Sequence, residues 1–232
     1  MSDIFSSLRL PDMVTLLNAL CGFGAIVVTQ YGMVQLSCTL ILLAAIADGL
    51  DGSLARYIGG SDIGESLDSL ADVISFGVAP AIMIISYAGG VFVFVAVCFY
   101  LICGILRLAR FNISKPDNSF FKGLPITAGG IAVSTIILVG QEHLQPTLIA
   151  MICIILGTLM ISSIPYMKIR GKRKTLPLTL IFALSIVSYL VDPATTRLCT
   201  IPLIMVMIVY IISPMFIKNM EKDPHEYNEQ YN

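Results

Sequence analysis

The chain has 232 residues, of which 56% are hydrophobic and 12% are charged, and its mean hydropathy is +0.88. Soluble domains carry about 25% charged residues, so this composition excludes an ordinary soluble protein. The formal net charge of −1 gives no electrostatic reason to expect a nucleic-acid partner. We therefore expect an integral membrane protein surrounded by membrane lipids.

Eight apolar segments approach the length of about 20 residues that a helix needs to cross a bilayer. In chain order they cover residues 12–30, 33–57, 65–88, 91–111, 124–141, 146–164, 176–191 and 198–217. They predict an all-α fold, a polytopic membrane bundle of about eight transmembrane helices. We expect one membrane domain over residues 1–232, with a catalytic half at 1–122, additional helices at 123–217 and a polar tail at 218–232.

Basic residues indicate how this bundle is oriented. With eight spans, Arg9, Arg56, Arg107, Arg110 and the basic run at 168–174 fall on one side of the membrane, and Arg197 falls on the other. Short loops rich in lysine and arginine face the cytoplasm. We expect a cell-membrane protein whose termini, and the adjoining ends of its second and third spans, face the cytoplasm.

Four aspartates lie inside apolar segments, with Asp48 and Asp51 in the second and Asp68 and Asp72 in the third. Spacings of three and four residues place each pair on one helix face. A carboxylate at the centre of a membrane helix costs about 2.5–3.5 kcal/mol. Hard divalent cations prefer oxygen ligands, and two-metal sites serve displacements at phosphorus. We expect the four carboxylates to converge on two divalent ions, Mg²⁺ or Mn²⁺. The alternatives are structural carboxylates and a water-filled ion path.

These acids belong to a longer pattern, Asp48-Gly-Leu-Asp51-Gly52-Ser-Leu-Ala55-Arg56, which is followed by Gly64, Asp68 and Asp72. The pattern resembles the signature of the CDP-alcohol phosphatidyltransferase family, D-x-x-D-G-x-x-A-R and then G-x-x-x-D-x-x-x-D. It departs from the signature in one respect, because seven residues separate Arg56 from Gly64 where the family usually has eight. Residues 10–18, 68–80, 107–112 and 121–125 further resemble the phosphatidylserine synthase subfamily.

The resemblance implies transfer of a phosphatidyl-type group from a CDP-activated lipid, ester- or ether-linked, to the hydroxyl of L-serine, with release of CMP. It implies that Asp48, Asp51 and Asp68 hold the metal ions, while Asp72 assists with the second ion and accepts the serine proton. The motif contains no obvious protein nucleophile, so we expect direct attack by serine. Members of the family form homodimers, and we expect a homodimer here.

The resemblance also suggests which residues contact the substrates. We expect the CDP group to be bound by Gly52, Ala55, Arg56, Gly64, Asn18 and Thr15. Polar contacts between helices are an alternative role for Asn18 and Thr15, and Arg56 has the alternative of holding the carboxylates from behind. We expect the serine acceptor to be bound by Arg110, Arg107 and Lys122, since a planar guanidinium suits a carboxylate. For the arginines, anchoring by positive charge is the alternative.

Three other functions compete with serine transfer. A sister enzyme acting on glycerol 3-phosphate or inositol phosphate would need more basic charge than Arg107, Arg110 and Lys122 provide. By family resemblance, the acidic motifs of an intramembrane prenyltransferase lie far apart in the sequence, whereas here they are adjacent. An intramembrane cation transporter would show half-helices or inverted repeats, and the sequence indicates neither. Serine transfer is therefore favoured.

Overall fold

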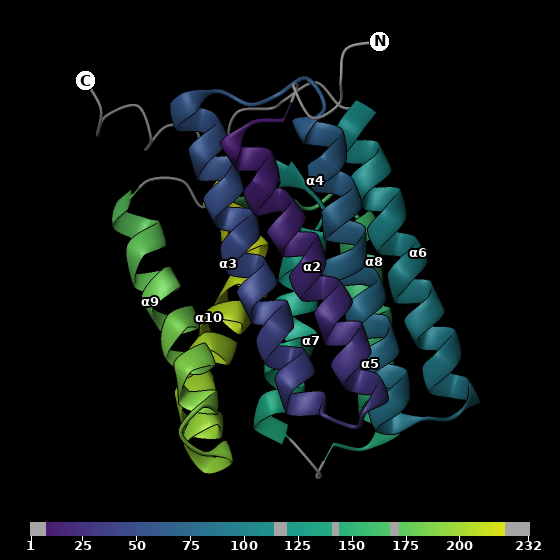
Figure 1. Ribbon diagram of the computed structural model, residues 1–232. Helices are drawn as coiled ribbons and strands as arrows, with labels where there is room; N and C mark the ends of the chain where they lie inside the picture. Colours follow the sequence, from purple (N-terminus) through teal and green to yellow (C-terminus); the bar gives the residue numbers. More distant parts are fainter. Residues whose placement is uncertain (1–7, 114–119, 141–143, 168–171, 221–232) are drawn as a thin grey trace.

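The computed structural model describes residues 8–113, 120–140, 144–167 and 172–220 (Figure 1). Most of the tail expected at 218–232 lies outside the described residues, and so does the first part of the basic run at 168–174.

The first half of the chain forms long helices joined by short connections. Helix α2 spans Leu10–Gln30, α3 spans Val34–Ile58 and α6 spans Val91–Ile113. Between α3 and α6 the chain forms one continuous rod, which consists of α4 (Gly64–Asp72), the π-helical segment η1 (Val73–Val78) and α5 (Ala79–Ala88). Helices α2, α3 and α6 and this rod are each long and apolar enough to cross a membrane.

The second half supplies α7 (Ile126–Gly140), α8 (Pro146–Ile161), α9 (Lys172–Tyr189) and α10 (Pro193–Met220). A segment of α10, Thr195–Pro214, is a further candidate span. Within the described residues, α7, α8 and the stretch Thr179–Tyr189 are shorter apolar helices. The predicted all-α membrane bundle is confirmed, and its helices lie close to the eight predicted segments.

Glycines mark the ends of several helices. Gly32, Gly59 and Gly89 have φ values of 75°, 86° and 60°, which side chains with a Cβ atom rarely adopt. The turn at Gly59 reverses the chain between α3 and α4. As a result the C-terminal end of α3 and the N-terminal end of α4 lie at the same end of the bundle, where α6 also ends (Figure 1).

Two short strands are a feature that the sequence analysis does not anticipate. Strand β1 (Phe120–Lys122) pairs antiparallel with β2 (Pro165–Met167), and Phe121 lies opposite Tyr166. Both strands fall in connections between apolar segments, and three residues are too few to show an alternating pattern. The pair joins the α6–α7 connection to the α8–α9 connection.

The π-helical segment η1 begins directly after Asp72 and lies at the centre of the bundle. A Cβ atom at Gly22 of α2 would overlap Ser75, and one at Gly130 of α7 would lie 3.0 Å from the Phe76 backbone. Small residues allow this close packing of helices in membranes. Tyr100 of α6, fully buried, donates a hydrogen bond to the Phe76 carbonyl at 2.7 Å. Three helices thus fix the rotation of the rod that carries Asp72.

Candidate functional site

Three of the predicted carboxylates form a compact cluster. Asp48 projects from α3, and Asp68 and Asp72 project from α4, one turn apart. One carboxylate oxygen from each of these residues lies within 4.8 Å of the others. The turn at Gly59 brings the two helices together, so that acids 20 or more positions apart in the sequence meet.

Asp51 has different surroundings from the other three acids. It is 5% exposed, and its Oδ2 atom accepts a hydrogen bond of 2.6 Å from the Thr15 hydroxyl of α2. Three residues advance a helix by about 300°, so Asp51 is turned from Asp48 toward α2. The structure therefore gathers three of the four expected carboxylates into the cluster and places Asp51 against α2.

The donor set of the cluster fits a divalent cation. The Oδ1 atom of Asp68 is buried and has no hydrogen-bond partner in the described part of the chain. Three carboxylates so close together repel one another in a low-dielectric environment, and a cation relieves that repulsion. Oxygen ligands of this kind suit Mg²⁺ and Mn²⁺. Asp48, Asp68 and Asp72 are the residues that could hold such an ion.

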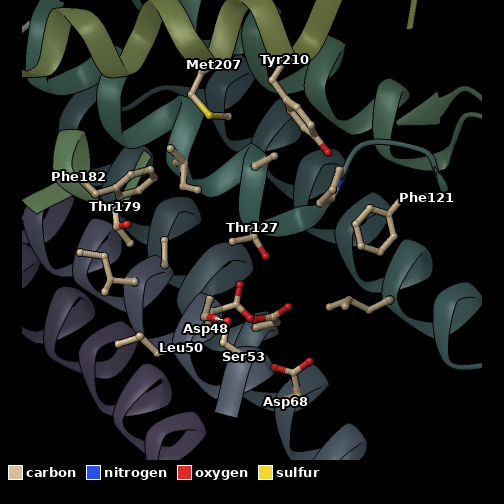
Figure 2. A pocket seen from close by; sticks show the side chains of 18 of the residues that line it. Asp48, Leu50, Ser53, Asp68, Phe121, Thr127, Thr179, Phe182, Met207 and Tyr210 are labelled. Atoms are coloured by element: carbon tan, nitrogen blue, oxygen red, sulfur yellow. Dashed lines mark hydrogen bonds between the residues drawn. The ribbon is translucent and has the colours of Figure 1, made fainter. Parts of the chain in front are cut away.

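The cluster opens into a pocket of about 650 Å³, the size of typical small-molecule sites. Figure 2 shows Asp48 and Asp68 on one side of this pocket and Met207 and Tyr210 on the opposite side. Thr127 of α7 directs its hydroxyl toward the carboxylates (Figure 2). Residues of α9 and α10 complete the apolar wall, among them Phe182 and Met207. The catalytic half expected at residues 1–122 therefore supplies the acids, and the second half of the chain supplies much of the rest of the pocket wall.

Arg107 is a basic residue that faces this pocket. It is 6% exposed, and its Nε atom is buried without a hydrogen-bond partner among the residues that the structure describes. Its guanidinium carbon lies 5.5 Å from the ring centroid of Phe111 and 5.4 Å from that of Phe121, distances typical of cation–π contacts. A buried, always charged group with unused donor capacity is suited to an anionic ligand.

Arg110, expected to bind the acceptor, instead has a structural environment. Its guanidinium donates to the carbonyls of Ile161 (3.0 Å), Met160 (3.2 Å) and Ser162 (3.1 Å) at the C-terminal end of α8. It also donates to the Lys122 carbonyl of β1 at 2.6 Å. Carbonyls at a helix C-terminus lack helical partners and attract cations. The structure does not support acceptor binding by Arg110. The Lys122 side chain is exposed, and Lys122 is not one of the described residues that line the pocket.

Replacing Arg110 with alanine should destabilise the fold. Hydrogen bonds to charged groups contribute about 1.5–3 kcal/mol, so we expect the unfolding midpoint in detergent to fall by roughly 3–12 °C. Arg56→Ala is the control, since Arg56 donates to Ser53 on the exposed side of its own helix (3.1 Å) and should leave the midpoint within about 2 °C. A midpoint for Arg110→Ala as high as that of the control would contradict this structural role.

Polar residues of α2 contact two of the aspartates. This role differs from the CDP binding that was expected of them. The side-chain nitrogen Nδ2 of Asn18 lies 3.4 Å from Asp72 Oδ1, and the backbone carbonyl of Asn18 accepts a hydrogen bond from the Ser75 hydroxyl at 2.9 Å. Asn18 is fully buried, and Thr15 donates to Asp51. The structure therefore favours the alternative of polar contacts between helices for Thr15 and Asn18.

Asp12 is a residue that the sequence analysis passes over. It is 1% exposed, and its carboxylate accepts hydrogen bonds from the Ser61 hydroxyl (2.9 Å) and the Arg9 backbone amide (2.6 Å). A Cβ atom at Gly64 would lie 3.1 Å from its Oδ1 atom. A carboxylate near the start of an apolar span was a usable signal, because it needs partners there. Asp12 fixes the loop between α3 and α4.

The residues expected to bind CDP therefore differ in their surroundings. Gly64 packs against Asp12 and Ser61. This close packing is enough to explain why a glycine occupies the position, and no contact with a nucleotide is needed. Among the described residues, a Cβ atom at Gly52 would meet the Arg56 side chain alone, at 3.4 Å, so it has open space beside it. Ala55 is half-buried and Arg56 is exposed on the same stretch of α3. Gly52, Ala55 and Arg56 keep their predicted role as candidates for CDP binding.

Comparison with known proteins gives a consistent result. Residues 8–160 match the family model described as CDP-alcohol phosphatidyltransferase. An archaetidylserine synthase from Methanothermobacter thermautotrophicus is 42% identical over 175 residues, which cover 72% of this chain and 73% of that protein. The CDP-diacylglycerol–serine O-phosphatidyltransferase of Methanocaldococcus jannaschii is 37% identical over 173 residues, covering 74% and 80%. The enzyme of the same name from Bacillus subtilis is 34% identical over 161 residues, covering 68% and 89%.

Proposed function

The chain belongs to the CDP-alcohol phosphatidyltransferase family, and from this premise we propose that it transfers a phosphatidyl-type group from a CDP-activated lipid to the hydroxyl of L-serine, releasing CMP. The protein is thus a membrane-embedded transferase of phospholipid biosynthesis. The observation that carries the proposal is a single pocket with three clustered carboxylates and one buried guanidinium. Ester- and ether-linked lipids both suit this reaction, because they differ away from the diphosphate.

Asp48, Asp68 and Asp72 would hold divalent metal, on which the family generally depends. We propose two ions, Mg²⁺ or Mn²⁺, with Asp51 as a further ligand on the strength of the family pattern. Bound ions would neutralise the diphosphate and the leaving CMP oxygen. The hydrogen bond from Thr15 holds the Asp51 carboxylate in one orientation.

Asp72 would act as the general base in a direct displacement. It is 6% exposed, and Asn18 lies against its Oδ1 atom. We propose that Asp72 accepts the hydroxyl proton of serine as the serine oxygen attacks the lipid-linked phosphorus and the bond from that phosphorus to CMP breaks. Proton transfer in the transition state needs correct placement of the carboxylate more than a high pKa. The close packing of α2, α6 and α7 against η1 holds the neighbouring Asp72 in place.

Arg107 would bind the serine carboxylate. A planar guanidinium can make two parallel hydrogen bonds to a carboxylate, and the Phe111 and Phe121 rings limit its movement. Among the described residues that line the pocket, Arg107 is the basic one. A phosphorylated acceptor such as glycerol 3-phosphate carries more negative charge and would call for more than one cation. The lining therefore favours serine over the sister acceptors.

Purified protein should release CMP from a CDP-lipid with L-serine and divalent metal, and far less with glycerol 3-phosphate or inositol phosphate. Arg107→Lys keeps the charge but loses the planar geometry. We expect it to raise the KM for serine by about 10–100-fold, with the KM for the CDP-lipid within about threefold. Equal increases in both KM values would indicate a structural role for Arg107. Turnover with a phosphorylated acceptor in place of serine would overturn the proposed reaction.

We further propose that the pocket faces the cytoplasm of a cell-membrane protein. Arg56, Arg107 and Arg110 lie near the end of the bundle where α3 meets α4, and positive charge is retained on the cytoplasmic side (Figure 1). The family resemblance supports a homodimer as the working assembly. It also supports a single membrane domain whose catalytic motifs lie in residues 1–122.

A further inference from the structure

Tyr210 of α10 lines the same pocket from the side opposite the acids. Its ring is partly buried, and its hydroxyl end is directed toward the pocket interior (Figure 2). It lies well beyond residue 160, where the match to the family model ends. The acidic motif therefore does not predict a role for Tyr210. The folding of the second half of the chain places Tyr210 in the pocket.

The strand β2 fixes the orientation of Tyr210. The Tyr210 hydroxyl donates to the Met167 carbonyl at 3.4 Å, and its ring lies 5.6 Å from the Tyr166 ring at an interplanar angle of 41°. Tyr166 is fully buried, and its own hydroxyl donates to the Ile211 carbonyl, also at 3.4 Å. These contacts restrict Tyr210 to one side of the pocket, as expected for a tyrosine with an apolar ring and a bonded polar end.

The hydrogen bond that the Tyr210 hydroxyl already makes limits how it can bind a ligand. A phenol has one O–H donor and lone pairs that accept. The donor is used by Met167, so the oxygen can contribute only as an acceptor. Tyr210 also lies close enough to Arg107 to interact with it electrostatically. The pocket thus brings together a guanidinium that can only donate and a phenolic oxygen that can accept.

We propose that Tyr210 is a specificity-determining residue for the acceptor, whose ammonium group donates a hydrogen bond to the phenolic oxygen while Arg107 binds the carboxylate. This inference rests on the proposed transfer to serine. The two residues together recognise both charged groups of an amino acid. The acceptor hydroxyl then remains available to Asp72, which lines the same pocket.

The test compares Tyr210→Phe with Tyr166→Phe in CMP-release assays on the full-length protein. Each change removes one hydroxyl and keeps the ring, and in each case the lost hydrogen bond went to a backbone carbonyl at 3.4 Å. Tyr210→Phe should raise the KM for L-serine about 10–100-fold and leave the KM for the CDP-lipid within about twofold. Tyr166→Phe should leave the KM for serine within about twofold, since Tyr166 is not one of the pocket-lining residues described.

A second measurement separates recognition of the ammonium from a general change in the pocket. The compound 3-hydroxypropanoate has the hydroxyl and carboxylate of serine but no ammonium group. Its inhibition constant should be the same within about twofold for the wild type and Tyr210→Phe. An unchanged KM for serine in Tyr210→Phe, or an equal loss for serine and 3-hydroxypropanoate, would overturn the role of Tyr210. If the wild type itself shows no serine-dependent CMP release, the proposed function fails and this inference fails with it.

Discussion

Asp72→Asn should lower the rate of CMP release by about 10²–10⁴-fold while the affinity for the CDP-lipid stays within about threefold. Asparagine has nearly the shape of aspartate but cannot take a proton at neutral pH. Asp72 is buried, lies against Asn18 and is followed directly by the tightly packed η1 segment, so an isosteric change should leave the backbone in place. Rates should be measured at saturating metal and serine, which removes any effect of weaker ligand binding.

Asp62→Asn is the matched control for this change. Asp62 is an exposed aspartate in the loop between α3 and α4, outside the carboxylate cluster, so its substitution should leave turnover within about twofold. Equilibrium binding of a labelled CDP-lipid would be measured on both variants. Turnover of Asp72→Asn within about tenfold of the wild type would reject Asp72 as the base. A parallel loss of lipid binding would assign Asp72 to substrate binding instead.

The helices could be predicted from the sequence because each membrane-spanning segment is a long, nearly uninterrupted run of hydrophobic residues. Apolar length located α2 and α3 closely, since residues on both the lipid and the protein side of these helices are hydrophobic. The π-helical turn η1 was not predictable, because it depends on Gly22, Gly130 and Tyr100 from three other helices. The β1–β2 pair likewise depends on a contact between two distant connections.

In the site, too, features set by local sequence could be predicted, and features set by contacts between distant segments could not. Helical spacing placed each pair of aspartates on one helix face, and all four were expected to converge, whereas the structure brings together Asp48, Asp68 and Asp72 and turns Asp51 toward α2. Spacing alone could not separate Arg107 from Arg110, which are three residues apart on α6. The position of the α8 C-terminus decides between them, because it occupies Arg110 and leaves Arg107 to the pocket.

Asp48→Asn should have opposite effects on the metal-free and the metal-bound protein. Asp48 lies within 4.8 Å of two other carboxylates, so removing its charge reduces repulsion, and the unfolding midpoint of the metal-free protein should rise. A ligand at 100 times its Kd stabilises a protein by about 2.7 kcal/mol, which is roughly 5–10 °C for a chain of this size. We expect Mn²⁺ to raise the midpoint of the wild type by that amount and to raise that of Asp48→Asn far less. CMP release should fall at least about 10²-fold in the variant, because the diphosphate is then poorly neutralised.

Two comparisons make this prediction specific to the cluster. Asp62→Asn carries the same change of charge at an exposed site and should keep the full response to Mn²⁺. Asp51→Asn alters an acid that is bonded to Thr15, so its metal-free midpoint should not rise as that of Asp48→Asn does. A response to Mn²⁺ in Asp48→Asn equal to that of the wild type would show that these carboxylates do not hold the ion. A lower metal-free midpoint would show that the hydrogen bonding of Asp48 stabilises the fold by more than its repulsion of the other carboxylates destabilises it.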